Sequence, residues 1–287
     1  MNINTVAVLG FGTMGAGIAQ SVAQSGRQVL VLETTENRIQ AGQEALDAFL
    51  STGVARGKHT EAEKAEVQGR VAGVTGVDQL KDVDLVIEVV TENMEVKKSL
   101  LGQVAAVVGP DVPLLTNTSA LSVTDLASAL EHPERVAGLH FFNPAPLMKI
   151  VEIVRALQTR EDLVPVLEEF VKSMGKTPVV VKDRPGFLVN WLLLPYLNDV
   201  MRAYDEELAS AEDIDTAMRL GLGYKQGPME LLDLIGLDVH LHATSNAYEA
   251  THDSRFAAPP LLSQMVAAGY LGNKSERGFR KGEEVQA

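Results

Sequence analysis

The stretch that decides the fold reads Thr5-Val-Ala-Val-Leu-Gly-Phe-Gly-Thr-Met-Gly15. Its first five residues are mostly apolar and rich in β-branched side chains, which favours a buried strand. After the glycines, apolar residues recur at helical spacing from Ile18 to Ala23, and Gly26 follows as a natural helix stop. A second apolar run, Gln28 to Glu33, ends in an acid. This order of strand, glycine loop, helix and strand predicts a β-α-β unit.

The glycine loop carries Gly10, Gly12 and Gly15 at the spacing of a dinucleotide fingerprint, with Thr13 and Met14 between the last two. Such a loop lets the backbone approach a pyrophosphate at the helix N-terminus, where N–H groups and the helix dipole attract anions. Glu33 stands where an acid accepts from the adenosine ribose and would repel a 2′-phosphate. We therefore expect NAD rather than NADP. The alternative, that the glycines only form a tight turn, explains less of this context.

Composition narrows the class of protein. The chain has 287 residues, no cysteine and a formal net charge of −13. No apolar run reaches the length of about 18 residues that a membrane helix needs, and no basic leader precedes the first strand. We expect a cytoplasmic protein that binds neither membranes nor nucleic acid, whose phosphates the acidic surface would repel. Without cysteine there is no thiolate nucleophile, and we expect no metal site.

Further alternation of strands and helices predicts an α/β fold with a Rossmann-type, doubly wound, mostly parallel sheet. The remaining strands are expected at 71–75, 83–90, 113–117, 135–141, 149–154 and 177–181, the last pair running against the rest, and the helices at 36–50, 60–68, 93–108, 122–130 and 161–174. Residues 36–69 should form a helical hairpin inserted in this domain. Its tip carries Arg56 and Lys58, which meet a charged ligand or are simply solvated.

A turn and a shift in composition at 182–186 place a domain boundary there, giving domains of 1–183 and 184–287. Beyond it, apolar residues recur at helical spacing throughout. Helices are expected at 187–207, 211–220, 229–235, 238–249 and 261–268, so the second domain should be all-α. Its first helix is apolar on every side over 187–196, which predicts burial in the domain core or in a subunit interface.

A second stretch, 138–152, holds the candidate chemistry. His140 follows a β-rich run, Pro144 and Pro146 break the backbone, and Glu152 lies in the next apolar run. A histidine can act as a general base near neutral pH, and a fixed carboxylate can hold its tautomer. The alternative is a loop histidine and an unrelated strand glutamate. Other polar residues also follow predicted strands, where parallel sheets place their sites: Glu92, Asn117, Ser119 and Asn143.

Together these motifs resemble the NAD-dependent 3-hydroxyacyl-CoA dehydrogenases of fatty acid metabolism, over nearly the whole chain. The resemblance is carried by Gly10-Phe-Gly-Thr-Met-Gly15, Asn117-Thr-Ser119, His140-Phe-Phe-Asn143-Pro144, Glu152, Pro185-Gly-Phe-Leu-Val-Asn190 and Gly227-Pro-Met-Glu-Leu-Leu-Asp-Leu-Ile-Gly-Leu-Asp238. In length the chain is similar to the compact bacterial 3-hydroxybutyryl-CoA dehydrogenases of that family.

The resemblance implies roles for individual residues. It makes His140 the catalytic base and Glu152 its partner, with Ser119 and Asn190 bonded to the substrate oxygen. It places Glu92, Lys97 and Asn143 near the nicotinamide of NAD, with Asn117 also on the cofactor side, and Lys58 near CoA. An acyl-CoA substrate and a homodimer formed through the helical domain are implied as well.

Some positions depart from the family pattern. Trp191 replaces a usual arginine, Lys225-Gln226 replaces a usual Pro-Met, and the C-terminus keeps Gly278-Phe279 but lacks the tyrosines that commonly follow. They bear on substrate range and dimer packing. Two rival functions remain. One is a β-hydroxyacid dehydrogenase, a class that generally relies on a catalytic lysine in the helical domain, whereas here Asn190 occupies the corresponding helix. The other is a non-catalytic NAD-binding protein of the same fold.

Overall fold

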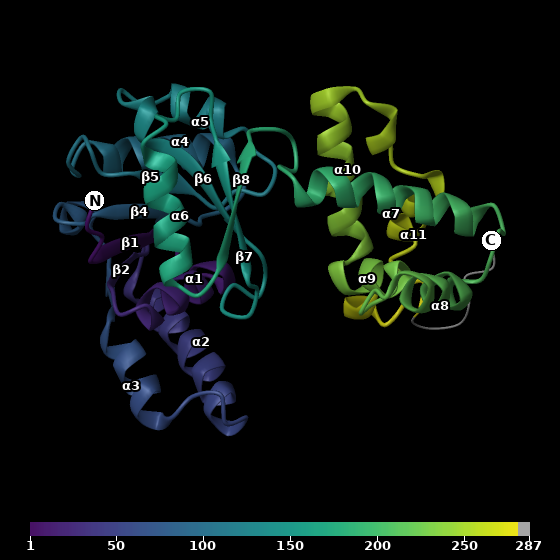
Figure 1. The fold of residues 1–287 in the computed structure, drawn as a ribbon, viewed down its shortest axis with the longest axis horizontal. Coiled ribbons are helices and arrows are strands. Elements are labelled where there is room, and N and C mark those ends of the chain that lie inside the picture. The colour runs from purple at the N-terminus through teal and green to yellow at the C-terminus, as the bar shows by residue number, and fades with distance from the viewer. Residues whose placement is uncertain (281–287) are drawn as a thin grey trace. The chain divides into compact units, whose positions relative to one another are not determined.

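The glycine-loop strand β1 lies near the centre of an eight-stranded sheet in the computed structural model, which describes residues 1–280 (Figure 1). The strand order is β3-β2-β1-β4-β5-β6-β7-β8. Strands β3 to β6 run parallel, β7 pairs antiparallel with β6, and β8 is parallel to β7. The predicted doubly wound sheet, with its last two strands reversed, is confirmed.

The strands are short and mostly buried. They are β1 Thr5–Leu9, β2 Gln28–Leu32, β3 Val71–Val74, β4 Leu85–Glu88, β5 Leu114–Thr116, β6 Val136–Phe141, β7 Ile150–Arg155 and β8 Thr177–Lys182. The helices of this unit are α1 Thr13–Gln24, α2 Glu36–Ala55, α3 Glu61–Gly69, α4 Met94–Ala105, α5 Val123–Ser128 and α6 Leu163–Ser173. Short 3₁₀ turns occupy Val77–Leu80 and Pro133–Arg135.

Helices cover both faces of the sheet. The connection from β1 to β2 runs toward one edge of the sheet, and the connection from β4 to β5 runs toward the opposite edge. Because both crossovers are right-handed, their helices α1 and α4 lie on opposite faces of the sheet. Apolar side chains of α1 and α6 share one core with the sheet, including Ile18, Leu167 and Phe170. This arrangement sets the switch point between β1 and β4, where doubly wound sheets bind ligands.

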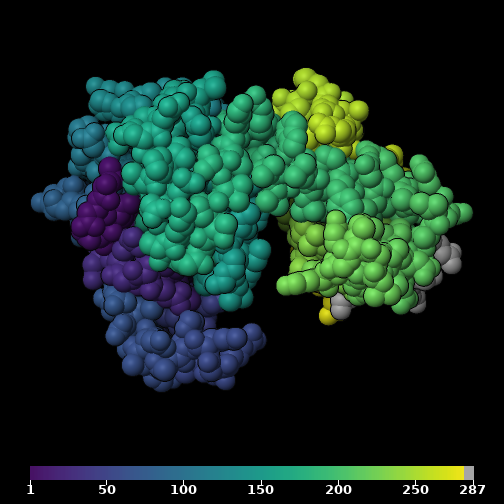
Figure 2. All heavy atoms as spheres, viewed as in Figure 1, coloured from purple at the N-terminus to yellow at the C-terminus, as the bar shows by residue number. Residues whose placement is uncertain are grey.

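The hairpin α2–α3 projects beyond the sheet (Figures 1 and 2). Thr60 and Glu63 form a capping box at the start of α3. The predicted end of α2 at Leu50 is wrong, because the helix continues to Ala55. Gly53 lies inside it, where a side chain would come within 2.6 Å of the His59 ring. This glycine therefore makes room for His59 instead of ending the helix.

The chain folds as two compact units, the first ending at Asp183 and the second beginning at Arg184. The helices of the second unit are α7 Val189–Asp205, α8 Ala211–Leu222, α9 Pro228–Ile235, α10 Leu237–Thr251 and α11 Pro260–Ala267, with 3₁₀ turns at Ser254–Phe256 and Asn273–Ser275. Its described residues are helical apart from turns and one isolated bridge between Gly272 and Arg277. The residues that would follow Gly278-Phe279 in the family pattern lie largely outside the described part of the chain.

The first helix of this unit is not buried on every side. Leu194 and Leu197 are buried, whereas Leu192 on the same helix is 64% exposed. The domain core of the second unit therefore buries only one side of this helix, and the prediction that the core buries the whole segment is wrong. No described helix has the length and hydropathy to cross a membrane.

A buried polar network joins three elements of the second unit. His240 Nε2 lies 3.0 Å from Asn198 Oδ1, the Asn198 amide donates to Thr244 Oγ1 at 2.8 Å, and Thr244 donates to the Phe256 carbonyl at 2.8 Å. Burial lowers the pKa of His240 to about 4, because the charged imidazolium loses its hydration. The network thus needs His240 neutral.

This burial predicts a pH dependence of stability. As pH falls from 6.5, the ordinary pKa of histidine, toward 4, the unfolded chain gains a proton at His240 that the folded chain does not. The unfolding free energy should fall by about 2–3 kcal/mol at pH 4.5 from this group. Measured by urea unfolding, the drop in unfolding free energy from pH 7 to pH 4.5 should be smaller in His240→Gln than in the wild type. Control variant His242→Gln, on the same helix, should behave as wild type; equal pH slopes in all three proteins would contradict the account.

Candidate active site

The glycine loop shapes the start of α1. Gly10 has φ +106°, and a side chain there would lie 3.0 Å from the Val89 carbonyl oxygen. A side chain at Gly15 would come within 2.0 Å of the Gly10 carbonyl oxygen. At Gly12, the N-cap of α1, nothing lies within 4 Å of an added side chain, and no side chain caps the helix. The N-terminus of α1 is therefore open, as a pyrophosphate requires.

Glu33 is held beside this loop, directly after β2. Its Oε1 accepts from the Phe11 N–H at 2.8 Å and its Oε2 from the Thr34 N–H at 3.0 Å. The two backbone bonds fix an acid where a dinucleotide fold reads the adenosine ribose. The open helix end and this fixed carboxylate fit NAD.

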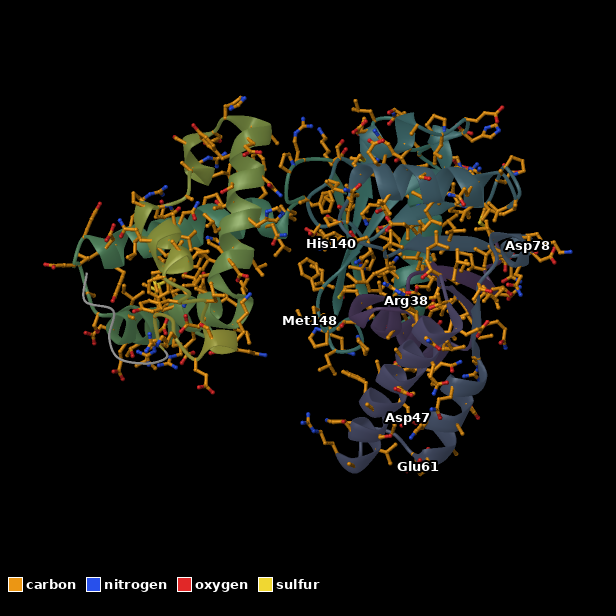
Figure 3. The ribbon with its side chains drawn as sticks, turned by 180° about the vertical axis from the view of Figure 1, so that it is seen from behind. Arg38, Asp47, Glu61, Asp78, His140 and Met148 are labelled. Carbon is orange, nitrogen blue, oxygen red and sulfur yellow. The ribbon has the colours of Figure 1, made fainter. Side chains whose placement is uncertain are left out.

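His140 and Glu152 lie directly opposite one another on β6 and β7. Residues opposed in an antiparallel pair share a face, with Cβ atoms about 4.5–5.5 Å apart. His140 Nδ1 is 2.7 Å from Glu152 Oε2, and both side chains are buried, at 5% and 0% exposure. Figure 3 labels His140 on the sheet. His140 lies inside β6, within the strand expected at 135–141, and this position aligns it with Glu152.

Asn117 holds the strand end next to His140. Its side-chain oxygen accepts from the Phe141 N–H at 2.8 Å, and its own N–H donates to the Glu88 carbonyl at 2.8 Å. The side chain was expected on the cofactor side. In the structure its oxygen ties the end of β5 to the end of β6.

A buried ion pair that the sequence reading missed lies at the end of β4. Lys97 Nζ is 2.8 and 3.0 Å from the two oxygens of Glu88, and both residues are almost fully buried. Glu88 also accepts from Thr116 Oγ1 and from the Val90 N–H, each at 2.7 Å. An acid ending the apolar strand Leu85-Val-Ile-Glu88, with a lysine nine residues later, was the available signal.

The same lysine reaches toward the loop that carries Ser119. Lys97 Nζ is 3.3 Å from Glu92 Oε2, while Glu92 Oε1 accepts from Thr118 Oγ1 at 2.5 Å and from the Ser119 N–H at 3.1 Å. Lys97 is therefore turned into the protein, where it contacts both Glu88 and Glu92. Ser119 itself is exposed.

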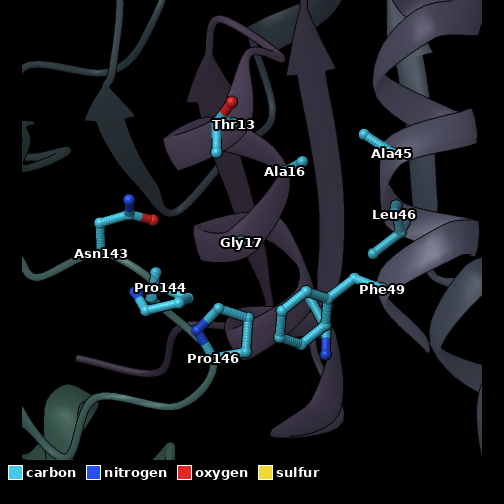
Figure 4. A pocket seen from close by; sticks show the side chains of 11 residues that line it. Thr13, Ala16, Gly17, Ala45, Leu46, Phe49, Asn143, Pro144 and Pro146 are labelled. Carbon is cyan, nitrogen blue, oxygen red and sulfur yellow. The ribbon is translucent and has the colours of Figure 1, made fainter. Parts of the chain in front are cut away.

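Two adjoining cavities lie between α1, α2 and the loop after β6. One, of about 280 Å³, includes Asn143 and Thr13 in its lining, and Figure 4 shows Pro144 and Pro146 on its loop side. The other, of about 560 Å³, is lined by the cations Arg56, Lys58, Lys149 and Lys176 among others. We call the two cavities together the groove. Asn143 and Lys58 both line this groove of the first unit, while Asn190 lies on α7 of the second unit.

Lys176 holds the loop between these cavities. Its Nζ donates to the carbonyl oxygens of Ala145 at 2.6 Å and Met148 at 2.8 Å. Burial, together with the nearby charge of Lys149, lowers the pKa of Lys176. Figure 3 shows Met148 on this loop, below His140 in that view.

Comparison with known proteins follows the same division of the chain. Residues 5–184 match the family profile "3-hydroxyacyl-CoA dehydrogenase, NAD binding domain", and residues 186–282 match "3-hydroxyacyl-CoA dehydrogenase, C-terminal domain". The chain belongs to the 3-hydroxyacyl-CoA dehydrogenase family. The resemblance seen in the sequence, and NAD as the cofactor of the fold, are thereby confirmed.

Relatives within the 3-hydroxyacyl-CoA dehydrogenases are similar over almost the whole chain. The 3-hydroxybutyryl-CoA dehydrogenase of Clostridioides difficile is 41% identical, covering 96% of this chain and 98% of its own. The 3-hydroxyadipyl-CoA dehydrogenase of Escherichia coli is 44% identical over 97% of this chain, which spans only 59% of that relative's length. The crystal structure of (S)-3-hydroxybutyryl-CoA dehydrogenase from Ralstonia eutropha has a TM-score of 0.94 at 40% identity, with 99% and 100% coverage.

The buried pair of Glu88 and Lys97 gives a stability prediction. Lys97→Met leaves the Glu88 carboxylate buried without its cation, which should cost about 3–5 kcal/mol of unfolding free energy. The double variant Lys97→Met/Glu88→Gln should recover much of that loss in urea unfolding. Lys98→Met is the matched control, since Lys98 pairs with the exposed Asp125 at 3.0 Å and should lose under about 1 kcal/mol. Equal losses in the two lysine variants would contradict this reading.

Proposed function

We propose that the protein interconverts (S)-3-hydroxyacyl-CoA and 3-oxoacyl-CoA with NAD, and that 3-hydroxybutyryl-CoA and acetoacetyl-CoA are a working substrate pair. The carrying observation is the buried 2.7 Å contact between His140 and Glu152 on the sheet that also bears the glycine loop. A protein that only binds NAD needs no such pair. Family membership and the similarity to full-length 3-hydroxybutyryl-CoA dehydrogenases support the same activity.

The proton steps belong to His140. Oxidation of a secondary alcohol requires the hydroxyl proton to leave as the hydride leaves carbon, and bound NAD would accept that hydride. Because Nδ1 faces Glu152, Nε2 is the nitrogen that takes the proton. The Glu152 carboxylate stabilises the resulting imidazolium and keeps the ring in one tautomer. In reduction the imidazolium returns the proton to the substrate oxygen.

The other residues bind and orient. We propose that Ser119 and Asn190 hydrogen-bond the substrate oxygen and stabilise charge that builds on it. Glu92 and Asn143 lie on the nicotinamide side, and Lys97 acts there by positioning Glu92. Glu33 binds the adenosine ribose, and the Gly10–Gly15 loop binds the pyrophosphate.

The groove supplies the contact with CoA. An acidic protein must meet the CoA phosphates with local cations, and Lys58 lies in the cationic cavity with Arg56, Lys149 and Lys176. We propose that Lys58 contributes to this contact. The hairpin α2–α3 would then form one wall of the CoA site.

A homodimer formed through the helical unit is also proposed. Five of its leucines are more than half exposed: Leu192, Leu208, Leu220, Leu222 and Leu234. A concentration of large apolar side chains on one domain favours burial against a second copy. Light scattering should give twice the chain mass of 30.9 kDa, and a monomer at micromolar concentration would contradict the proposal.

We also place the enzyme in the cytoplasm. The chain has no cysteine and so forms no disulfide, the bond that is typical of proteins in oxidising compartments. The proposed use of NAD and acyl-CoA agrees with this placement.

Activity tests the dyad directly. Wild-type protein mixed with NADH and acetoacetyl-CoA should lose NADH absorbance at 340 nm, a wavelength set by the reduced nicotinamide. His140→Gln should lower kcat by about 10²–10⁴-fold, since the proton donor is gone. Glu152→Gln should lower it less, because an amide oxygen still accepts from Nδ1 but carries no charge.

His132 provides the matched control, since it lies 3.2 Å from Glu134 on a half-exposed turn outside β6 and β7. His132→Gln should keep wild-type kcat. Near-normal turnover in His140→Gln would overturn the assigned base. Tight NADH binding by the wild type, with no turnover of any 3-oxoacyl-CoA, would instead favour a non-catalytic protein.

A further inference from the structure

Gln20 on α1 is a buried amide without a partner. It is 1% exposed, and within residues 1–280 neither its Nε2 nor its Oε1 has a hydrogen-bond partner. A buried polar group left unpaired costs about 1–3 kcal/mol, so native proteins rarely keep one without a use. The apolar side chains of the same helix, such as Ile18 and Val22, meet no such cost.

Gln20 lies where the two cavities of the groove meet. It lines both of them, as do Phe49 and Pro146. The smaller cavity has mainly apolar walls from α1, α2 and the 143–146 loop (Figure 4). The larger one carries the cluster of cations described above. Along the groove, therefore, an apolar section, a buried amide and a cationic section follow one another.

The carrier arm of CoA has the same order of chemical groups. Its pantetheine part consists of apolar methylenes interrupted by two secondary amides, and it ends in a diphosphate. A primary amide side chain offers one acceptor and one donor group, which pair with the N–H and C=O of a secondary amide. A methylene chain in the apolar section and phosphates in the cationic section would leave an amide facing Gln20.

We propose that Gln20 hydrogen-bonds an amide of the pantetheine arm and thereby makes the enzyme selective for thioesters of that carrier. This inference rests on the proposed function, because it takes CoA as the carrier. In this role Gln20 determines specificity and takes no part in the proton transfer.

Gln103 on α4 is a matched control outside the groove. It is exposed, it lines neither cavity, and its Nε2 donates to Ser99 Oγ at 3.4 Å. Gln20→Met and Gln103→Met each remove one side-chain amide from a helix and keep the length of the side chain. Circular dichroism and thermal unfolding first establish that both variants fold as the wild type does.

The test compares two thioesters in the NADH assay: acetoacetyl-CoA and S-ethyl acetoacetothioate, which has no amide. In Gln20→Met, KM for acetoacetyl-CoA should rise about tenfold with kcat little changed, which is the effect of losing one to two hydrogen bonds. For the ethyl thioester, kcat/KM should be unchanged. Gln103→Met should match the wild type with both compounds. Equal changes with both thioesters, or none with acetoacetyl-CoA, would overturn the proposal.

Calorimetry separates this inference from the proposed activity. Titration of free CoA into the protein saturated with NAD should give a dissociation constant about tenfold higher in Gln20→Met than in the wild type. This readout stands even if the wild type fails to reduce acetoacetyl-CoA, an outcome that would remove the proposed function alone. Identical CoA affinity in the two proteins would overturn the role of Gln20.

Discussion

The contact between His140 Nδ1 and Glu152 Oε2 depends on the register in which β6 pairs with β7. The chain must reverse after β6 so that β7 returns antiparallel and sets Glu152 opposite His140. A slip of one residue would carry Glu152 to the other face of the sheet. Gly138 helps to fix this register, because any side chain there would lie 2.6 Å from Cβ of its partner Val154. The pair is therefore built by the pairing of β6 with β7 in the sheet.

Elsewhere in the same unit, polar side-chain contacts organise the loops. Asn117 ties the end of β5 to β6, Lys176 holds the loop that lines the groove, and Lys97 connects Glu88 to Glu92. The contacts of Lys97 with Glu88 and of Lys176 with the Ala145 carbonyl are buried, where an unpaired polar group is costly and alternative loop positions are disfavoured. The sheet thus positions the proposed base, whereas side-chain contacts position the loops that are proposed to bind ligands.

The sequence alone predicted the helices and strands in which apolar residues recur with a clear period, and the motifs whose residues are close together in the chain. The glycine loop and the reversed final strands could be predicted, whereas the length of α2 could not, because Gly53 makes room for His59 inside the helix. Pairing across the sheet could not be read either, since it depends on register between distant residues. Glu88 was missed because a buried acid in an apolar strand looks like a strand end, and Gln20 because nothing in a helix pattern shows that an amide lacks a partner.

The tautomer of His140 is the most direct test of the account. Long-range proton–nitrogen NMR spectra of protein labelled with ¹⁵N-histidine, assigned with His140→Gln, report which ring nitrogen carries the proton in the neutral form. The account predicts the proton on Nδ1, donated to Glu152, with Nε2 as the acceptor. A neutral ring protonated on Nε2 would contradict the assignment of Glu152 as orienter and of His140 as the base.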